Sequence, residues 1–283
     1  GIGTFFPLWM LKYLPNMLSC HVSIFHDLQG VSNTVTTGNT SAHQSIGEAL
    51  NIVRREDADI MVAGAGESKV HPLVMARMNL QGLLPPEEGD PAAASRPFDK
   101  THAGSLASEG AGILVLEEAD HAEKRGRTPL AEIAGFSAVC GGASPHCYEG
   151  MGEPIEKAIR RALEQAGVWP EDVSLISACG YGVPNADREE AAAIRAVFPE
   201  GVPVTAMKSI LGNAGAGSGA VELVGAIQAM THGVIPPTLN FTEPDPECAI
   251  APVTEPTEAN LHTVVSLAFT LGGQASAIVL KKA

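Results

Sequence analysis

Basic residues are scarce in this chain of 283 residues: 18 Lys and Arg stand against 32 Asp and Glu, for a formal net charge of −14. Nucleic acid binding depends on clustered Lys and Arg that neutralise phosphates, so this balance argues against a nucleic acid partner. It argues equally against an anionic membrane surface. No apolar run reaches the roughly 20 residues that cross a bilayer, so we expect no contact with a membrane.

Metal-binding and nucleotide-binding motifs are also lacking. The five cysteines form no C-x-x-C pair and no Cys/His metal spacing, which predicts no metal site and reduced thiols in a cytoplasmic protein. The glycine-rich run over residues 212–219 lacks the G-K-[ST] ending of a phosphate-binding loop. We therefore expect no bound cofactor.

What the chain does have is a hydrophobic fraction of 45%, enough to bury a large core. Its periodicity predicts alternating strands and helices. Strands are expected over residues 32–37, 59–64, 112–118, 130–139, 173–178, 204–206, 264–269 and 275–281, and helices over residues 8–21, 41–55, 122–128, 154–167, 187–198 and 214–232. The alternation restarts near residue 127, which predicts two α/β halves, residues 1–127 and 128–283, with helices covering the sheets.

Three short segments carry the most specific patterns. Residues 36–42 read T-T-G-N-T-S-A, residues 177–184 read S-A-C-G-Y-G-V-P, and residues 208–213 read K-S-I-L-G-N. They resemble, in turn, the T-A-C-T-S-G nucleophile turn and the N-A-H-G-T-x-T-P and K-S-x-x-G-H motifs of β-ketoacyl synthases. Asn39 stands in the cysteine position of that family, and Cys179 and Asn213 stand in its two histidine positions.

Further landmarks extend the resemblance over nearly the whole chain, among them R-P-F-D at residues 96–99 and E-G-A-G at residues 109–112. The resemblance implies an α/β, thiolase-like fold of five layers (αβαβα) with duplicated halves. Residues 187–205 are most similar to chain-length factors, the non-condensing partners of type II polyketide synthases. A glycine turn at residues 1–3 resembles a point well inside the family's proteins, so we expect an N-terminal part to be missing and a skipped loop between residues 3 and 4.

The three replacements imply a loss of condensing chemistry. Condensation needs an activated nucleophile and donors for a developing negative charge. The carboxamide of Asn39 cannot accept an acyl chain, Asn213 cannot titrate, and Cys179 is a weak donor. We therefore expect none of the three to be catalytic. A relocated nucleophile at Cys179 stays an alternative to the favoured interpretation, a buried structural thiol.

The surroundings of the three positions are changed as well. Lys208 and Glu109 are retained, and the resemblance implies that they pair and support the site. The family's two threonines that contact a phosphopantetheine arm are replaced by Tyr181 and Val183. The R-D-G-F that follows P-F-D in the family becomes H-A-G-S at residues 102–105. These changes predict a loss of direct substrate loading.

The leading hypothesis is a non-condensing, ketosynthase-like subunit that partners an active β-ketoacyl synthase in fatty acid or type II polyketide biosynthesis. It predicts a hetero- or homodimer in which the 32–37 strand meets its equivalent in the partner, with Asn39 near the interface. An acyl carrier protein is a further expected partner, although such carriers are also acidic. The alternatives are a divergent acyltransferase that uses Cys179, and a stand-alone module that binds an acyl or pantetheine group.

Overall fold

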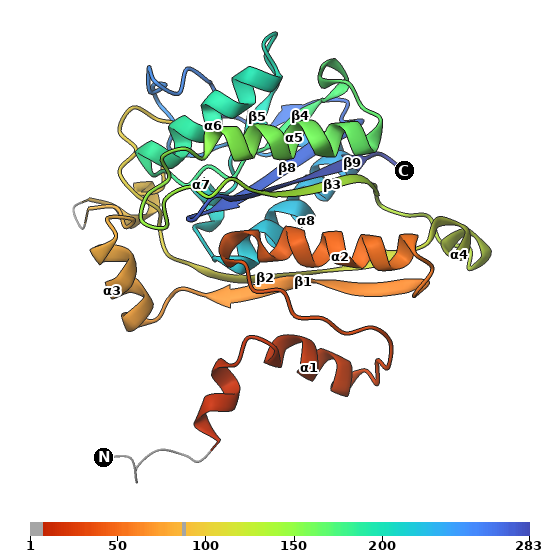
Figure 1. Ribbon diagram of the computed structural model, residues 1–283. Coiled ribbons are helices and arrows are strands. Elements are labelled where there is room, and N and C mark those ends of the chain that lie inside the picture. The colour runs from red at the N-terminus through yellow and green to blue at the C-terminus, as the bar shows by residue number, and fades with distance from the viewer. Residues whose placement is uncertain (1–7, 87–88) are drawn as a thin grey trace.

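Five layers of secondary structure make up the fold, and Figure 1 shows them stacked one above the other. The computed structural model describes residues 8–86 and 89–283. The layers are an outer helix pair (α5, Gly152–Ala166, and α6, Pro184–Val197), a five-stranded sheet, a central helix pair (α2, Ser41–Arg54, and α8, Ala216–His232), a two-stranded sheet (β1, Ile60–Ser68, and β2, Glu109–Glu117) and α1 (Met17–Phe25). The predicted layered α/β fold is confirmed.

The five-stranded sheet belongs to the second half of the chain. Its strands, in spatial order, are β3 (Glu132–Cys140), β9 (Gln274–Lys281), β8 (Thr263–Thr270), β4 (Leu175–Ser177) and β5 (Val204–Thr205). β4 runs parallel to both of its neighbours, whereas β9 runs antiparallel to β3 and to β8. Helices cover both faces, so β8 and β9 are buried along most of their length and read as near-continuous apolar runs.

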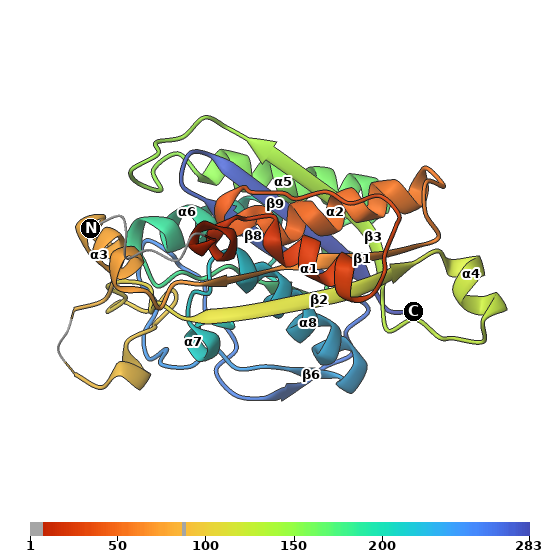
Figure 2. The same ribbon diagram turned by 90° about the horizontal axis from the view of Figure 1, so that it is seen from below.

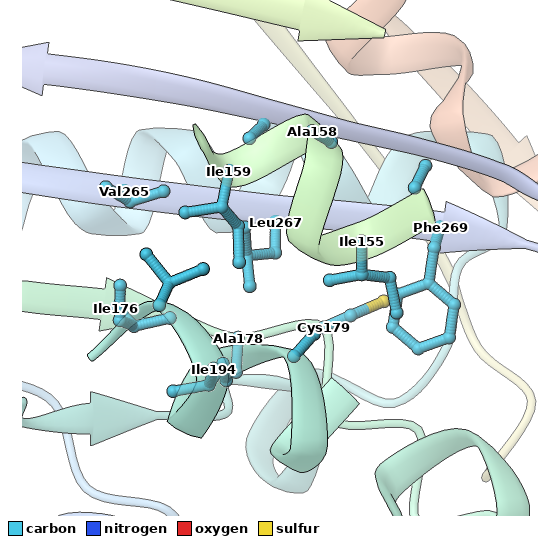
Figure 3. Close-up of a cluster of buried hydrophobic side chains, with 14 of the residues drawn as sticks. Ile155, Ala158, Ile159, Ile176, Ala178, Cys179, Ile194, Val265, Leu267 and Phe269 are labelled. Atoms are coloured by element: carbon cyan, nitrogen blue, oxygen red, sulfur yellow. The ribbon is translucent and has the colours of Figure 1, made fainter. Parts of the chain in front are cut away.

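Two apolar cores hold the layers together. In the first, Ile155 and Ile159 of α5 pack toward Leu267 and Phe269 of β8, as Figure 3 shows. Apolar residues recur along α5 at helical spacing, so one side of this helix is buried. The second core lies around α2 and α8 between the two sheets. There the layers approach closely, because a Cβ added at Gly112 of β2 would lie 2.8 Å from the carbonyl carbon of Ala220.

The remaining elements are short connections at the edges of the layers. They are η2 (Trp9–Tyr13), η3 (Gly38–Thr40), α3 (Pro72–Leu80), η4 (Pro91–Ala93), α4 (Ala119–Lys124), η5 (Pro170–Asp172), α7 (Lys208–Leu211), β6 (Val234–Ile235) and β7 (Thr257–Glu258). Across residues 8–86 and 89–283, none of the helices has the length and apolarity that crossing a membrane requires.

The expected strand over residues 32–37 is wrong, because these residues have no regular secondary structure. A strand needs a neighbour that satisfies its backbone N–H and C=O groups. None of the other described strands pairs with this segment. Its last residue, Thr37, instead donates its N–H to Ser41 Oγ at 2.9 Å.

The expected helix over residues 8–21 is also corrected. The chain forms η2 and then α1, with a break around Pro15. Proline has no N–H to donate, and it forces the preceding Leu14 into an extended conformation (φ −75°, ψ 130°). Helix α3 was not expected at all. The expected separation between residues 3 and 4 lies outside the described residues.

Candidate functional site

Asn39 lies in η3, where the chain turns into α2. The turn requires glycine at position 38, because φ is +62° there and a Cβ would lie 2.9 Å from Thr270 Oγ1. The Asn39 side chain is buried, and its Nδ2 donates a hydrogen bond to Tyr181 Oη over 2.6 Å. Asn39 thus lies immediately before the helix that we expected over residues 41–55.

Tyr181 connects Asn39 to a cluster of aromatic side chains. Its hydroxyl donates a hydrogen bond to the carbonyl oxygen of Phe269. Its ring stacks on Tyr148 at a centroid distance of 5.3 Å and meets Phe269 edge-on at 5.0 Å. Burial raises the pKa of Tyr181 well above its ordinary value, so the phenol is neutral. The carboxamide of Asn39 therefore faces a packed aromatic cluster.

Cys179 follows β4 and is buried on all sides. Figure 3 shows it within the first core, near Ile155 and Phe269. Its own N–H donates to Glu190 at 2.6 Å. Burial raises the pKa of the Cys179 thiol to about 12, so the nucleophilic thiolate is not populated near pH 7. The predicted buried thiol is confirmed.

Lys208 sits between Cys179 and α8. Its Nζ donates to the carbonyl oxygen of Cys179 at 3.0 Å, contacts Cys179 Sγ at 3.3 Å and donates to Glu222 Oε1 at 2.6 Å. These three contacts use all three N–H groups of an ammonium. Burial alone would lower the pKa of Lys208, but Cys179 and Glu222 outweigh it and raise that pKa. Lys208 is therefore a paired structural cation and not an amine nucleophile.

The predicted pairing of Lys208 with Glu109 is wrong. Glu109 lies at the exposed start of β2, where its carboxylate accepts a hydrogen bond from Ser68 Oγ at 2.7 Å. The acidic partner of Lys208 is Glu222, which α8 directs into the core. A sequence signal for it exists, because Glu222 is the only Asp, Glu, Lys or Arg in the apolar α8.

Asn213 precedes α8 and supports the local turn. Its Oδ1 accepts the N–H of Gly215 at 3.0 Å. Its backbone pairs with the opposite segment, donating to Leu106 O at 2.7 Å and accepting from Ser108 N at 3.1 Å. The structure thus brings Asn39 and Cys179 together around Tyr181, while no hydrogen bond between described residues joins the Asn213 side chain to either of them.

The arrangement offers little for catalysis. The imidazole nearest in sequence to Asn39 is His43, whose Nε2 lies 3.2 Å from Ser266 Oγ in the core. Burial lowers the pKa of His43 to about 3, so it is uncharged at neutral pH. Nothing in the described part of the chain gathers three or more His, Cys, Asp or Glu side chains for a metal ion. The assembled groups can hold one another in place, but they include no activated nucleophile.

Comparison with known proteins gives matches along most of the chain. Residues 4–122 match the family model of the β-ketoacyl synthase N-terminal domain, and residues 130–242 match that of the C-terminal domain. One relative is the "oxytetracycline polyketide putative beta-ketoacyl synthase 1" of Streptomyces rimosus, with 36% identity over 95% of this chain and 64% of the relative. Another is the mitochondrial 3-oxoacyl-[acyl-carrier-protein] synthase of Arabidopsis thaliana, with 34% identity over 94% of this chain and 60% of the relative.

Solved structures match equally well. A type II polyketide synthase acyl-carrier protein in complex with its ketosynthase has a TM-score of 0.93 and 29% identity, covering 96% of this chain and 68% of that chain. The ishigamide ketosynthase/chain length factor has a TM-score of 0.88 and 32% identity, covering 95% of this chain and 66% of that chain. The chain thus spans less than two thirds of the length of the curated relatives it matches.

Proposed function

Since the chain belongs to the β-ketoacyl synthase family, we propose that it is a ketosynthase-like subunit that does not itself condense acyl groups. It works in the cytoplasm beside an active β-ketoacyl synthase, in the manner of a chain-length factor, in fatty acid or type II polyketide biosynthesis. The observation that carries this proposal is the hydrogen bond from Asn39 to Tyr181. The family's nucleophile position holds the side-chain amide of Asn39, and that amide is already hydrogen-bonded to the buried phenol of Tyr181.

The electrostatics of the site support the same proposal. A condensing site needs donors aimed at the oxygen on which negative charge develops. Here the cation nearest to Cys179 is Lys208, and all three of its N–H groups already have partners. The phenol of Tyr181 donates to the Phe269 carbonyl and not toward open space. These groups stabilise the fold and leave no donor free for a reacting carbonyl.

A partner subunit is supported by apolar surface on one side of the molecule. Helix α1 has no buried residue, and Ile24 and Phe25 on it are 76% and 84% exposed. The neighbouring β2 exposes Ile113 and Val115 on the face turned away from α2 and α8. Exposed apolar side chains gathered on one side of a molecule are a feature of protein interaction sites. Residues 32–37, through which we expected the partner to pair, form no strand. We therefore infer that the active ketosynthase, or a second copy of this chain, binds on the α1 and β1–β2 side (Figure 2).

The acyl carrier protein enters the proposal through the partner. One structural neighbour is described as a ketosynthase bound to its acyl-carrier protein. In this chain Tyr181 and Val183 stand where the family's two threonines contact a carrier arm, and Tyr181 is packed into an aromatic cluster. We infer that carriers load the active subunit, while this chain shapes the assembly.

The alternative, a divergent acyltransferase using Cys179, has one contact in its favour, the 3.3 Å approach of Lys208 Nζ to Cys179 Sγ. Burial opposes it, because a thiol with a pKa of about 12 on a 1% exposed residue is protonated and shielded. The subunit hypothesis is the one that the geometry favours.

The test is co-purification. We would express the tagged chain together with an active β-ketoacyl synthase encoded in the same genome and measure the mass of the purified complex. A stoichiometric complex is expected, and the tagged chain alone should form no acyl-enzyme after incubation with acyl carrier protein. A stable monomer that does not bind the ketosynthase, or an acyl group found on Cys179, would refute the proposal.

A further inference from the structure

A histidine outside the candidate site is buried between two carboxylates. The His102 side chain is 2% exposed, its Nδ1 lies 2.8 Å from Asp187 Oδ2, and its Nε2 lies 3.0 Å from Asp245 Oδ2. Carboxylates accept hydrogen bonds, so both contacts are satisfied only when both ring nitrogens carry a proton. A neutral imidazole would turn a lone pair toward one of the two carboxylates. The geometry therefore fits the imidazolium.

The groups around His102 come from two other parts of the chain. Asp187 belongs to α6 and is fully buried. Asp245 lies in the connection between β6 and β7, where it also accepts a hydrogen bond from Arg188 Nε at 3.0 Å. Arg188 in turn pairs with Glu247 at 2.6 Å. The imidazole of His102 thus contacts the carboxylates of both Asp187 and Asp245. The guanidinium of Arg188 contacts Asp245 and Glu247.

Three further titratable side chains lie near this pair of carboxylates. Burial raises the pKa of Cys248 to about 12, so its thiol stays neutral between pH 6 and 10. Burial also raises the pKa of Glu190 to about 8 and raises the pKa of Tyr148, and both side chains interact with Asp187, whose own pKa burial raises as well. Burial disfavours the charged form of His102, but Asp187 and Asp245 outweigh it and raise the pKa of His102 above its ordinary value. Of these groups, His102 is the one that bridges the two carboxylates, and it loses its charge at a higher pH than an ordinary histidine.

The segment that carries His102 runs along the candidate site. Gly104 donates its N–H to Gly182 O at 2.8 Å, next to Tyr181. Further on, Leu106 O accepts the N–H of Asn213 at 2.7 Å. Residues 102–106 have no helix or strand of their own, so their position depends on such contacts and on the anchored imidazole. The R-D-G-F motif of the family has an arginine in this position, and arginine does not titrate in the accessible pH range.

We propose that His102 is a pH-sensitive latch, which holds residues 102–108 against α6 and the Asn213 turn while it is doubly protonated and releases them when it loses a proton. The direction of the pH response follows from the attraction between the imidazolium of His102 and the two carboxylates. The latch is closed below the unfolded-state pKa of histidine, and it opens as pH rises through the higher value of the folded state. A segment beside the candidate site would thereby respond to a rise in pH.

The test combines NMR titration of the histidine rings with hydrogen exchange of the Gly104 and Ser105 amides between pH 6 and 10. Exchange rates are corrected for their intrinsic rise with pH. Protection of both amides should fall at least about tenfold as His102 titrates. In Asp245→Asn the midpoint should move about one pH unit lower, because one of the two carboxylate charges is lost. His262→Arg, which removes an exposed imidazole elsewhere, should change neither result.

A second variant, His102→Arg, restores the permanent charge and should make protection independent of pH. Protection that stays constant in the unmodified chain would overturn the latch, and so would an unchanged midpoint in Asp245→Asn. If His102→Arg does not fold, the shift of the His102 titration midpoint in Asp245→Asn still tests the proposal.

Discussion

Removing the charge of Lys208 is the perturbation whose consequence the structure defines best. Lys208 and Glu222 form a contact of 2.6 Å, with side chains only 2% and 3% exposed. Lys208→Met keeps the length of the side chain and leaves the Glu222 carboxylate buried without its counter-ion. Breaking one half of a buried ion pair typically costs about 3–5 kcal/mol of unfolding free energy. We expect a loss of that size at pH 7, measured by urea unfolding followed by circular dichroism.

The same pair provides its own controls. Lys208→Met/Glu222→Leu removes both charges and should recover most of the lost stability, because two apolar side chains need no counter-ion. Lys100→Met breaks a surface pair with Glu243, whose side chains are 53% and 64% exposed, and should cost less than about 1 kcal/mol. The reasoning fails if Lys208→Met costs no more than Lys100→Met, or if the double variant is as unstable as the single one.

The remaining predictions concern chemistry, pH and assembly. Iodoacetamide should label Cys179 far more slowly than the exposed Cys140 in the folded protein, and equal rates under native conditions would contradict the burial argument. Asn39→Cys alone should show no turnover with malonyl- and acyl-carrier substrates, because both histidine positions remain empty. Burial lowers the pKa of His43 to about 3, so between pH 6.5 and 3 the unfolded chain binds a proton at this residue that the folded chain does not bind. The free energy of unfolding should therefore fall by at most about 1.4 kcal/mol per pH unit as the pH falls through this range, and His43→Asn should reduce that slope. Val115→Lys should abolish complex formation with the ketosynthase without lowering the melting temperature of the isolated chain, and retention of the complex would move the interface elsewhere.

Much of the second half was predictable because its elements bury one face at a clear period. Helix α5 repeats apolar residues at helical spacing, and β8 and β9 are uninterrupted apolar strands between helix layers. Residues 32–37 have strand-like composition, but a strand also requires a hydrogen-bonding neighbour, which composition does not reveal. The break at Pro15 was readable in principle, since proline disfavours a continuous helix.

The candidate site was predictable in its positions and less so in its contacts. The motifs located Asn39, Cys179 and Asn213, but the partner of Lys208 depended on which side of α8 faces inward. The two ends of the Asn39–Tyr181 hydrogen bond lie 142 residues apart, so only the folded chain places them together. His102 was noted as a replacement within a motif, yet its two carboxylate partners became visible only in three dimensions.

The most direct test of the central claim is the release of carbon dioxide from labelled malonyl-carrier protein. The purified chain would be assayed with an acyl-carrier substrate, first alone and then together with an active β-ketoacyl synthase. We predict no release above the protein-free background for the chain alone, and sustained release and product formation only when the active partner is present. Multiple turnovers by the chain alone would contradict the claim that it keeps the fold of the family without its condensing chemistry.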